Sequence, residues 1–287
     1  MIKIDLVCPV YKNVTEIKRF IKSLSSQKNI LISNAVFPHT LCGNDNIDVE
    51  IESIVSKYKT FKINKEAFSH SLTREKAILE YCTENIVLLV SQDIVFEDET
   101  SIYNLVSKIN SEIIYVYGRQ VCKNNSIEKY IREKNYGSTD IVVDSTMIQE
   151  MQLMAFFSSD AFSALNRSKF LELGCYRGFN VMMNEDQLFS KFLLDAGYKK
   201  MYCAGAVVEH SHKYTLKQLY NRYYETGKFY KEIEVFDEYE LTESGISLAF
   251  YILKEALIHF NVPVLFRWLP DMAARYLGMR KGKKESI

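Results

Sequence analysis

The sequence predicts an α/β protein built on an open, mostly parallel sheet with helices on both faces. Short apolar stretches rich in β-branched residues alternate with stretches whose apolar residues recur at helical spacing. Residues 86–90 are continuously apolar, as is typical of a central strand covered on both faces. The 287 residues, of which 47% are hydrophobic and 25% charged, have the composition of an ordinary globular protein with a full core.

Taken in order, the pattern begins with a strand and a helix and repeats this pair. The predicted strands are residues 2–10, 29–34, 59–63, 86–90, 113–117 and 201–208, and the predicted helices are 17–24, 73–82, 102–109 and 188–193. Residues 118–159 are polar and irregular, and we expect them to cross the sheet as an active-site segment.

A carboxylate pair and a histidine pair are separated in the sequence by one predicted helix and one predicted strand. Glu185 and Asp186 precede the helix at 188–193, and His210 and His212 follow the strand at 201–208. Both pairs are therefore expected to meet at one edge of the sheet.

The sequence also argues against several classes of protein. Its 36 basic and 36 acidic residues cancel, so nothing in the net charge suggests a nucleic acid as partner. Neither G-x-G-x-x-G nor G-x-x-x-x-G-K occurs, which disfavours dinucleotide binding and P-loop hydrolysis. The six cysteines are scattered without a zinc-ligand spacing and are expected to be reduced thiols of a cytoplasmic protein.

In open α/β sheets, ligands bind at the carboxyl ends of the strands. The polar residues expected there are Pro9, Tyr11, Ser33, Asn34, Gln92, Asp93, the segment 158–160, Glu185, Asp186 and His210. A divalent ion held by Asp93 and His210 could neutralise a diphosphate without a glycine-rich loop.

Several motifs in a fixed order carry a family resemblance. They are Val7–Asn13, Phe68–Arg74, Ser91-Gln92-Asp93, Tyr117–Gln120, Asn184-Glu185-Asp186 and His210-Ser211-His212. Together they resemble the inverting family two glycosyltransferases and, within them, the bacterial rhamnosyltransferases, over residues 2–230.

The resemblance implies a GT-A-type fold, residues 1–214, that binds a nucleotide-sugar, with dTDP-L-rhamnose favoured, and uses Mg²⁺ or Mn²⁺. Asp186 is implied to be the catalytic base that activates an acceptor hydroxyl, and Asp93 and His210 the metal ligands. Pro9, Tyr11, Asn34 and Gln92 are implied to bind the donor, while Arg74 would steady Asp93 or a phosphate. The implied contacts with the sugar or acceptor are Arg119, Gln120, Ser159, Glu185 and His212.

Two positions depart from the family pattern. Ser91 stands where the metal motif has its first aspartate, so metal affinity without nucleotide should be weak. The second predicted strand ends in Ser33 and Asn34, where many relatives carry an aspartate that contacts the nucleobase or ribose.

Each residue also has an ordinary structural alternative. An acidic pair at a helix start can simply favour the helix dipole, and Asp93 could cap a turn. His210 and His212 could be hydrogen-bonded structural histidines, and Arg119 and Gln120 could only fix the crossing segment.

Residues 215–287 change character and are predicted to form a helical extension. Apolar residues such as Phe266, Trp268 and Leu269 accompany a basic tail that contains Arg275, Arg280, Lys281, Lys283 and Lys284. This combination predicts contact with an anionic membrane surface, with a solvated tail or an oligomer contact as alternatives. No stretch is apolar enough for a predicted transmembrane helix.

The sequence is therefore interpreted as a cytoplasmic enzyme that adds rhamnose to a growing surface polysaccharide, with the inner face of the cell membrane as a candidate location. Its acceptor would be a saccharide, carried on a lipid. Another donor, such as UDP-glucose, UDP-galactose or UDP-GlcNAc, is an alternative. A second alternative is a family member that binds nucleotide but does not catalyse transfer.

Overall fold

An eight-stranded sheet forms the centre of the molecule, with strand order β2-β1-β5-β9-β7-β10-β6 and β8 paired to β10. The computed structural model describes residues 1–239 and 242–285. The strands of this sheet are β1 (Ile2–Val7), β2 (Ile30–Val36), β5 (Ile86–Val90), β6 (Val95–Phe96), β7 (Ile113–Val121), β8 (Ile141–Val143), β9 (Phe162–Asn166) and β10 (Lys199–Glu209). A separate parallel pair joins β3 (His39–Thr40) to β4 (Lys62–Ile63).

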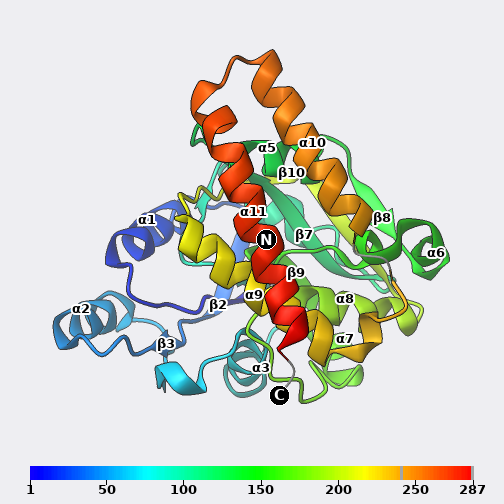
Figure 1. Cartoon of the computed structure of the whole chain (residues 1–287). Coiled ribbons are helices and arrows are strands. Elements are labelled where there is room, and N and C mark those ends of the chain that lie inside the picture. Colours follow the sequence, from blue (N-terminus) through cyan, green and yellow to red (C-terminus); the bar gives the residue numbers. More distant parts are fainter. Residues whose placement is uncertain (240–241, 286–287) are drawn as a thin grey trace.

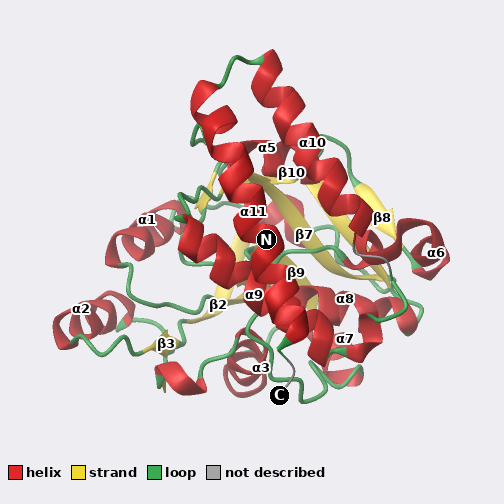
Figure 2. Ribbon diagram, in the orientation of Figure 1, coloured by secondary structure: helices red, strands yellow, loops and turns green. Residues whose placement is uncertain are grey.

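Helices surround this sheet (Figures 1 and 2). They are α1 (Val14–Leu24), α2 (Asp45–Val55), α3 (His70–Tyr81), α4 (Ser101–Val106), α5 (Ile127–Asn135), α6 (Ile148–Met151), α7 (Arg167–Glu172), α8 (Glu185–Asp195), α9 (Leu216–Glu232), α10 (Thr242–Ile258) and α11 (Val262–Lys284). Short 3-10 turns occur at Lys65–Ala67, Ser145–Met147, Gln152–Phe156 and Glu234–Phe236.

Most strands of the sheet run in one direction. β1 pairs in parallel with β2 and β5, and β7 pairs in parallel with β10. β9 lies between β5 and β7 and is antiparallel to both, so β5 and β7 also share a direction. The carboxyl ends of β1, β5, β7 and β10 therefore meet at one edge, and the predicted α/β fold with a mostly parallel sheet is confirmed.

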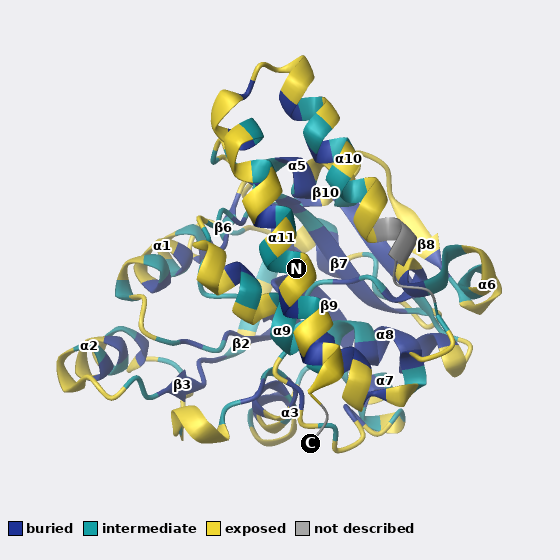
Figure 3. Ribbon diagram, in the orientation of Figure 1, coloured by how far each residue is buried: buried dark blue, intermediate teal, exposed yellow. Residues whose placement is uncertain are grey.

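Apolar cores cover both faces of the sheet (Figure 3). Along β5, Val87 and Leu89 belong to one core, and Leu88 and Val90 to the other. Alternate strand residues point to opposite faces, so this division requires packing on both sides. It explains why residues 86–90 are continuously apolar.

The prediction of an irregular segment over residues 118–159 is wrong. β7 continues to Val121, and α5, β8 and α6 follow. Gly118 allows the strand to continue, because a Cβ at this position would overlap the ring of Phe162 in β9. The polar residues Arg119 and Gln120 concealed this continuation from the apolar pattern.

Two strand boundaries also differ from the prediction. β2 extends past Asn34 to Val36, and of residues 59–63 only Lys62 and Ile63 form a strand, which pairs with β3 outside the main sheet. α3 begins at His70, three residues before the predicted start, because the Ser69 hydroxyl accepts a hydrogen bond from the Leu72 amide and caps the helix.

In the C-terminal part, α9 and α11 pack side by side. Cβ atoms at Gly278 and Gly282 would overlap the α9 carbonyl oxygens of Tyr220 and Tyr224, and one at Gly227 would overlap the carbonyl oxygen of Met279. Tyr220 meets Gly278, and four residues later Tyr224 meets Gly282, so the two helices run in the same direction. Phe229 and Phe236 from this part join the core that also contains Val87.

The connection between α10 and α11 projects from the body of the molecule, at the top of Figure 1. We call its exposed apolar side chains the hairpin tip. Phe260 is 86% and Phe266 82% exposed. The other members of the hairpin tip are Leu257, Ile258, Val262 and Leu269.

The basic tail does not join the hairpin tip in one surface. Arg275 is buried in ion pairs with Asp271 and Glu128, and the basic residues from Arg280 to Lys284 lie at the opposite end of α11. Within the described residues, no helix is both long and apolar enough to cross a membrane.

The contact between α9 and α11 should not tolerate a side chain at Gly282. We expect Gly282→Leu to lower the free energy of unfolding by roughly 1–3 kcal/mol, as overpacking typically does. Urea denaturation measures this change. Gly245→Leu in α10 is the matched control, because a Cβ at Gly245 has no neighbour within 4 Å. Equal stability of the two variants would contradict the close packing.

Candidate active site

Two loops at the carboxyl edge of the sheet are tied together by Gln92. The Gln92 side-chain oxygen accepts a hydrogen bond from the Tyr11 amide at 2.7 Å, and its nitrogen donates to the Tyr11 carbonyl at 2.8 Å. The amide group of Gln92 is therefore occupied in holding the loop after β1. This geometry favours a positioning role for Gln92 and leaves Pro9 and Tyr11, both half-buried, at the rim of the site.

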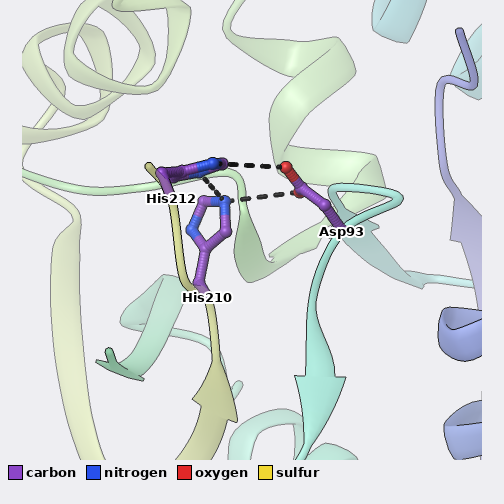
Figure 4. A group of neighbouring side chains, drawn as sticks. All are labelled: Asp93, His210 and His212. Atoms are coloured by element: carbon purple, nitrogen blue, oxygen red, sulfur yellow. Dashed lines mark hydrogen bonds and ion pairs between the residues drawn. The ribbon is translucent and has the colours of Figure 1, made fainter. Parts of the chain in front are cut away.

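Asp93, His210 and His212 form a compact group at the same edge (Figure 4). Asp93 Oδ1 lies 3.3 Å from His210 Nε2, and Asp93 Oδ2 lies 3.8 Å from His212 Nδ1. The two Nε2 atoms of the histidines are 2.6 Å apart. One ligand atom from each residue lies within 4.8 Å of the others, a separation suited to a single metal ion.

The structure brings His212 into this group, whereas the sequence predicts it as a contact of the sugar or acceptor. His212 follows His210 by two residues in extended chain after β10, so both imidazoles point to the same side. This spacing is the feature of the sequence that could have identified His212 as a third ligand.

The charge states of the group suit a cation. Burial lowers the pKa of His210, and burial together with the neighbouring His210 lowers the pKa of His212 to about 3. Burial opposes the ionisation of Asp93, but the neighbouring imidazoles of His210 and His212 hold the pKa of Asp93 well below its usual value. At neutral pH the group thus offers two neutral imidazoles and a carboxylate, the forms that bind a metal.

Gln120 supports His210 from β7. The Gln120 side-chain oxygen lies 2.7 Å from His210 Nδ1 and fixes the orientation of the ring. Gln120 is only 1% exposed, which favours this supporting role over the predicted contact with a sugar. Arg119 beside it is half-buried and its Nε has no hydrogen-bond partner, so its guanidinium is available to a ligand.

The acidic pair lies at the start of α8. Asn184 has a left-handed backbone, with φ of 66°, and turns the chain so that Glu185 and Asp186 occupy the first helical turn. Glu185 is buried against the guanidinium of Arg74, which also donates to the Asp160 carbonyl at 3.1 Å. Arg74 therefore contacts Glu185 and Asp160, and not Asp93 as the sequence predicts.

Within the described residues, Asp186 forms no ion pair, whereas Arg74 pairs with Glu185. It accepts hydrogen bonds from the amides of Gln187 at 2.7 Å and Asp160 at 3.2 Å. Burial and the nearby charge of Asp160 raise the pKa of Asp186 to about 7, although the two hydrogen bonds oppose the rise. A carboxylate that titrates near neutral pH is well suited to accept a proton.

Asp160 belongs to the segment 158–160, which the sequence places at the ligand-binding edge without a specific role for this residue. Its carboxylate accepts hydrogen bonds from Tyr115 at 2.7 Å and from Ser163 at 2.5 Å. It stands just before β9, at the carboxyl edge, because β9 is antiparallel and begins there. Ser159 precedes it and is half-buried, so it borders the same space.

Asn34 is placed differently from the other predicted donor residues. Its amide donates to Asp5 Oδ1 at 2.8 Å and to Thr83 Oγ1 at 3.0 Å, so it joins β2 to β1 and to the segment before β5. The sequence places Asn34 at the end of its strand, but the strand continues to Val36. These contacts give donor binding by Asn34 no support.

Known proteins similar to this chain are glycosyltransferases. No family model matches the chain. The O-antigen chain rhamnosyltransferase RfbN of Salmonella typhimurium is 29% identical over 235 residues, which cover 79% of this chain and 72% of that protein. The O-antigen chain rhamnosyltransferase WbaN of Salmonella anatum is 32% identical over 171 residues, 58% of this chain and 54% of its own length.

Solved structures extend the similarity to the fold. The mannosyltransferase PcManGT of Pyrobaculum calidifontis, in complex with GDP-Man and Mn²⁺, has a TM-score of 0.62 at 12% identity and covers 97% of this chain and 86% of its own. GalNAc-T7, with UDP, GalNAc and Mn²⁺, has a TM-score of 0.56 at 11% identity over 91% of this chain and 57% of its own. The chain thus has a GT-A fold and is similar in sequence to two O-antigen chain rhamnosyltransferases.

Proposed function

We propose that this glycosyltransferase moves L-rhamnose from dTDP-L-rhamnose to a hydroxyl group of a saccharide acceptor, with inversion at the sugar carbon. The observation that carries the proposal is the pKa of about 7 at Asp186, on the same sheet edge as the group of Asp93, His210 and His212. One centre can accept the proton of the acceptor, and the other can stabilise the leaving diphosphate.

Asp186 is proposed as the general base. In its ionised form it would accept the proton of the acceptor hydroxyl while that oxygen attacks the sugar from the side opposite the diphosphate. Arg74 pairs directly with Glu185, whereas its charge only partly offsets the rise in the pKa of Asp186, so the two neighbouring carboxylates are proposed to have separate tasks. Glu185 then holds the start of α8, which positions Asp186.

The proposed cofactor is a divalent ion held by Asp93, His210 and His212. The residues fit such an ion, because Asp93 Oδ1 is buried without a hydrogen-bond partner and both imidazoles are neutral. Two imidazoles favour a transition ion such as Mn²⁺ over Mg²⁺, which prefers oxygen ligands. The bound ion would neutralise charge that develops on the diphosphate. The presence of Mn²⁺ in the two structural neighbours supports this choice.

The donor would lie between these centres. Pro9 and Tyr11 are proposed to border the nucleoside, and Gln92 to hold Tyr11 in place. Arg119, with its unpartnered Nε, is proposed to contact the sugar or a phosphate, together with Ser159. Similarity to two rhamnosyltransferases favours dTDP-L-rhamnose over UDP-glucose, UDP-galactose or UDP-GlcNAc.

The names of the relatives support a role in synthesis of a surface polysaccharide such as an O-antigen. We propose that the enzyme acts in the cytoplasm on a lipid-linked saccharide. Residues 1–214 would form the catalytic domain and 215–287 a helical extension. The hairpin tip would rest on the inner face of the cell membrane.

A donor screen tests the base and the donor together. Wild-type protein with Mn²⁺ should bind and slowly hydrolyse dTDP-L-rhamnose in preference to UDP- and GDP-sugars, and EDTA should abolish both. Asp186→Asn should bind the donor normally but lose about two to four orders of magnitude in transfer rate. The kcat/KM of the wild type should rise with pH to a plateau above about 7, because only ionised Asp186 accepts a proton.

Asp195→Asn at the far end of α8 is the matched control and should transfer normally, since Asp195 pairs only with Lys191. Asp186→Asn should be no less stable than the wild type at pH 8. The raised pKa of Asp186 means that ionisation destabilises the folded wild type as the pH rises toward 7, and Asn avoids this cost. Undiminished transfer by Asp186→Asn would remove Asp186 from the base role. Absence of binding to every nucleotide-sugar would favour a non-catalytic family member.

Removal of His212 should weaken the metal centre as much as removal of His210. We expect His212→Ala and His210→Ala each to reduce the Mn²⁺-dependent affinity for dTDP-L-rhamnose by at least about tenfold, as measured by calorimetry. His259→Ala is the control, because the His259 side chain is 61% exposed in the turn after α10. If His212→Ala kept the wild-type affinity while His210→Ala lost it, His212 would not be a ligand.

Membrane contact through the hairpin tip can be tested without unfolding the protein. The double variant Phe260→Ser/Phe266→Ser should reduce co-sedimentation with anionic vesicles by about tenfold or more, because burial of each phenylalanine contributes roughly 1.5–3 kcal/mol. Val49→Ser removes a similarly exposed apolar side chain, 64% exposed on α2, and should have no effect. Equal sedimentation of all three proteins would place the membrane contact elsewhere or exclude it.

A further inference from the structure

A cavity of about 310 Å³ lies between the start of α5, the segment after His210 and the first turns of α11. We call it the α5–α11 cavity. Its walls include Ser126 and Glu128 from α5 and its cap, His212 and Tyr214, and Asp271 from α11. Its volume is at the lower end of the roughly 300–1,000 Å³ range of small-molecule sites and suits a short saccharide.

The cavity adjoins the proposed metal centre. His212 belongs to the group with Asp93 and His210 and also lines the cavity. The ring of Tyr214 stacks on His212 with centroids 4.8 Å apart and planes at 25°. A ligand in the cavity would therefore lie beside the group that is proposed to bind the donor diphosphate.

The walls carry fixed polar groups. Arg275 Nε donates to Asp271 at 2.6 Å, and Arg275 Nη2 donates to Glu128 at 2.6 Å. Both carboxylates are thus held in place, with further oxygen lone pairs to accept hydrogen bonds. The Ser126 hydroxyl oxygen is buried and has no hydrogen-bond partner. A ligand with several hydroxyl groups could satisfy all three residues.

The charge of the lining favours a neutral ligand. Glu128 and Asp271 are opposed by Lys213 and Arg267, so the acidic and basic side chains of the lining balance each other. A lining without an excess of cationic groups gives little attraction to a phosphate or a nucleotide. The aromatic ring of Tyr214 beside fixed hydrogen-bonding groups is instead the combination that suits a sugar ring, which has apolar faces and polar edges.

We propose that the α5–α11 cavity is a saccharide-binding subsite for the acceptor, adjacent to the transfer site. The inference rests on the proposed glycosyl transfer and adds where the acceptor binds. The outer wall contains Pro263 and Val264, next to the hairpin tip at Val262. A saccharide in the cavity would thus lie between the metal centre and the hairpin tip, as a lipid-linked acceptor requires.

Ser126→Phe tests the cavity directly. Ser126 precedes α5 without a capping hydrogen bond from its side chain, so the substitution removes no helix cap and fills the cavity. The probes are p-nitrophenyl glycosides of mannose, galactose and rhamnose, with binding followed by saturation-transfer NMR in the presence of Mn²⁺ and dTDP. Ser25→Phe is the matched control, because Ser25 lines a different cavity between α1 and β2.

We expect at least one glycoside to bind the wild type and Ser25→Phe, with affinity for Ser126→Phe lower by about tenfold or more. Equal binding to Ser126→Phe, or no glycoside binding to a wild type that binds dTDP-L-rhamnose, would overturn the inference. If Ser126→Phe does not fold, Lys213→Trp replaces it in the binding experiment. Lys213 is exposed and lines the same cavity, so a tryptophan there would also narrow the cavity. If the wild type did not bind the donor, the proposed function would be refuted instead.

Discussion

The buried guanidinium of Arg74 is the interaction on which the site depends. It joins α3 to Glu185 at the start of α8 and to the carbonyl of Asp160 before β9, across 111 and 86 residues of chain. Breaking one side of a buried ion pair commonly costs about 3–5 kcal/mol, because the remaining charge is left unpaired. One side chain therefore links the start of α8 to the segment before β9, in addition to the core contacts of α8.

This interaction also separates the properties of two adjacent carboxylates. Glu185 faces Arg74, whereas Asp186 faces the Asp160 amide and feels the charge of the Asp160 carboxylate. Neighbours in sequence thus have different electrostatic surroundings, and the pKa of Asp186 is raised to about 7. Acid and base functions in enzymes commonly arise from such a division. The arrangement needs both β9 and α8, which bring Asp160 and Asp186 together at the carboxyl edge.

The sequence predicted the parts of the site that depend on local pattern. Residues 86–90 form the expected strand, and Asp93 and His210 meet because the strands that precede them end at the same edge. It placed the segment 158–160 at this edge but could not predict the contacts of Asp160, because β9 is inserted antiparallel between β5 and β7, and strand order depends on tertiary packing. The partners of Arg74 and the α5–α11 cavity were hidden for the same reason, since each joins segments distant in sequence.

The link between Gln92 and Tyr11 has a thermodynamic consequence. Gln92 directly precedes Asp93, and both of its amide atoms are bound to the backbone of Tyr11. Two hydrogen bonds therefore link the loop after β1, which is proposed to border the nucleoside, to the loop after β5, which is proposed to hold the cation. A ligand that orders either loop would reduce the entropy that the other ligand must still remove, so the two affinities would rise together by the same factor. The backbone would thus add cooperativity between nucleotide and cation to their direct electrostatic attraction.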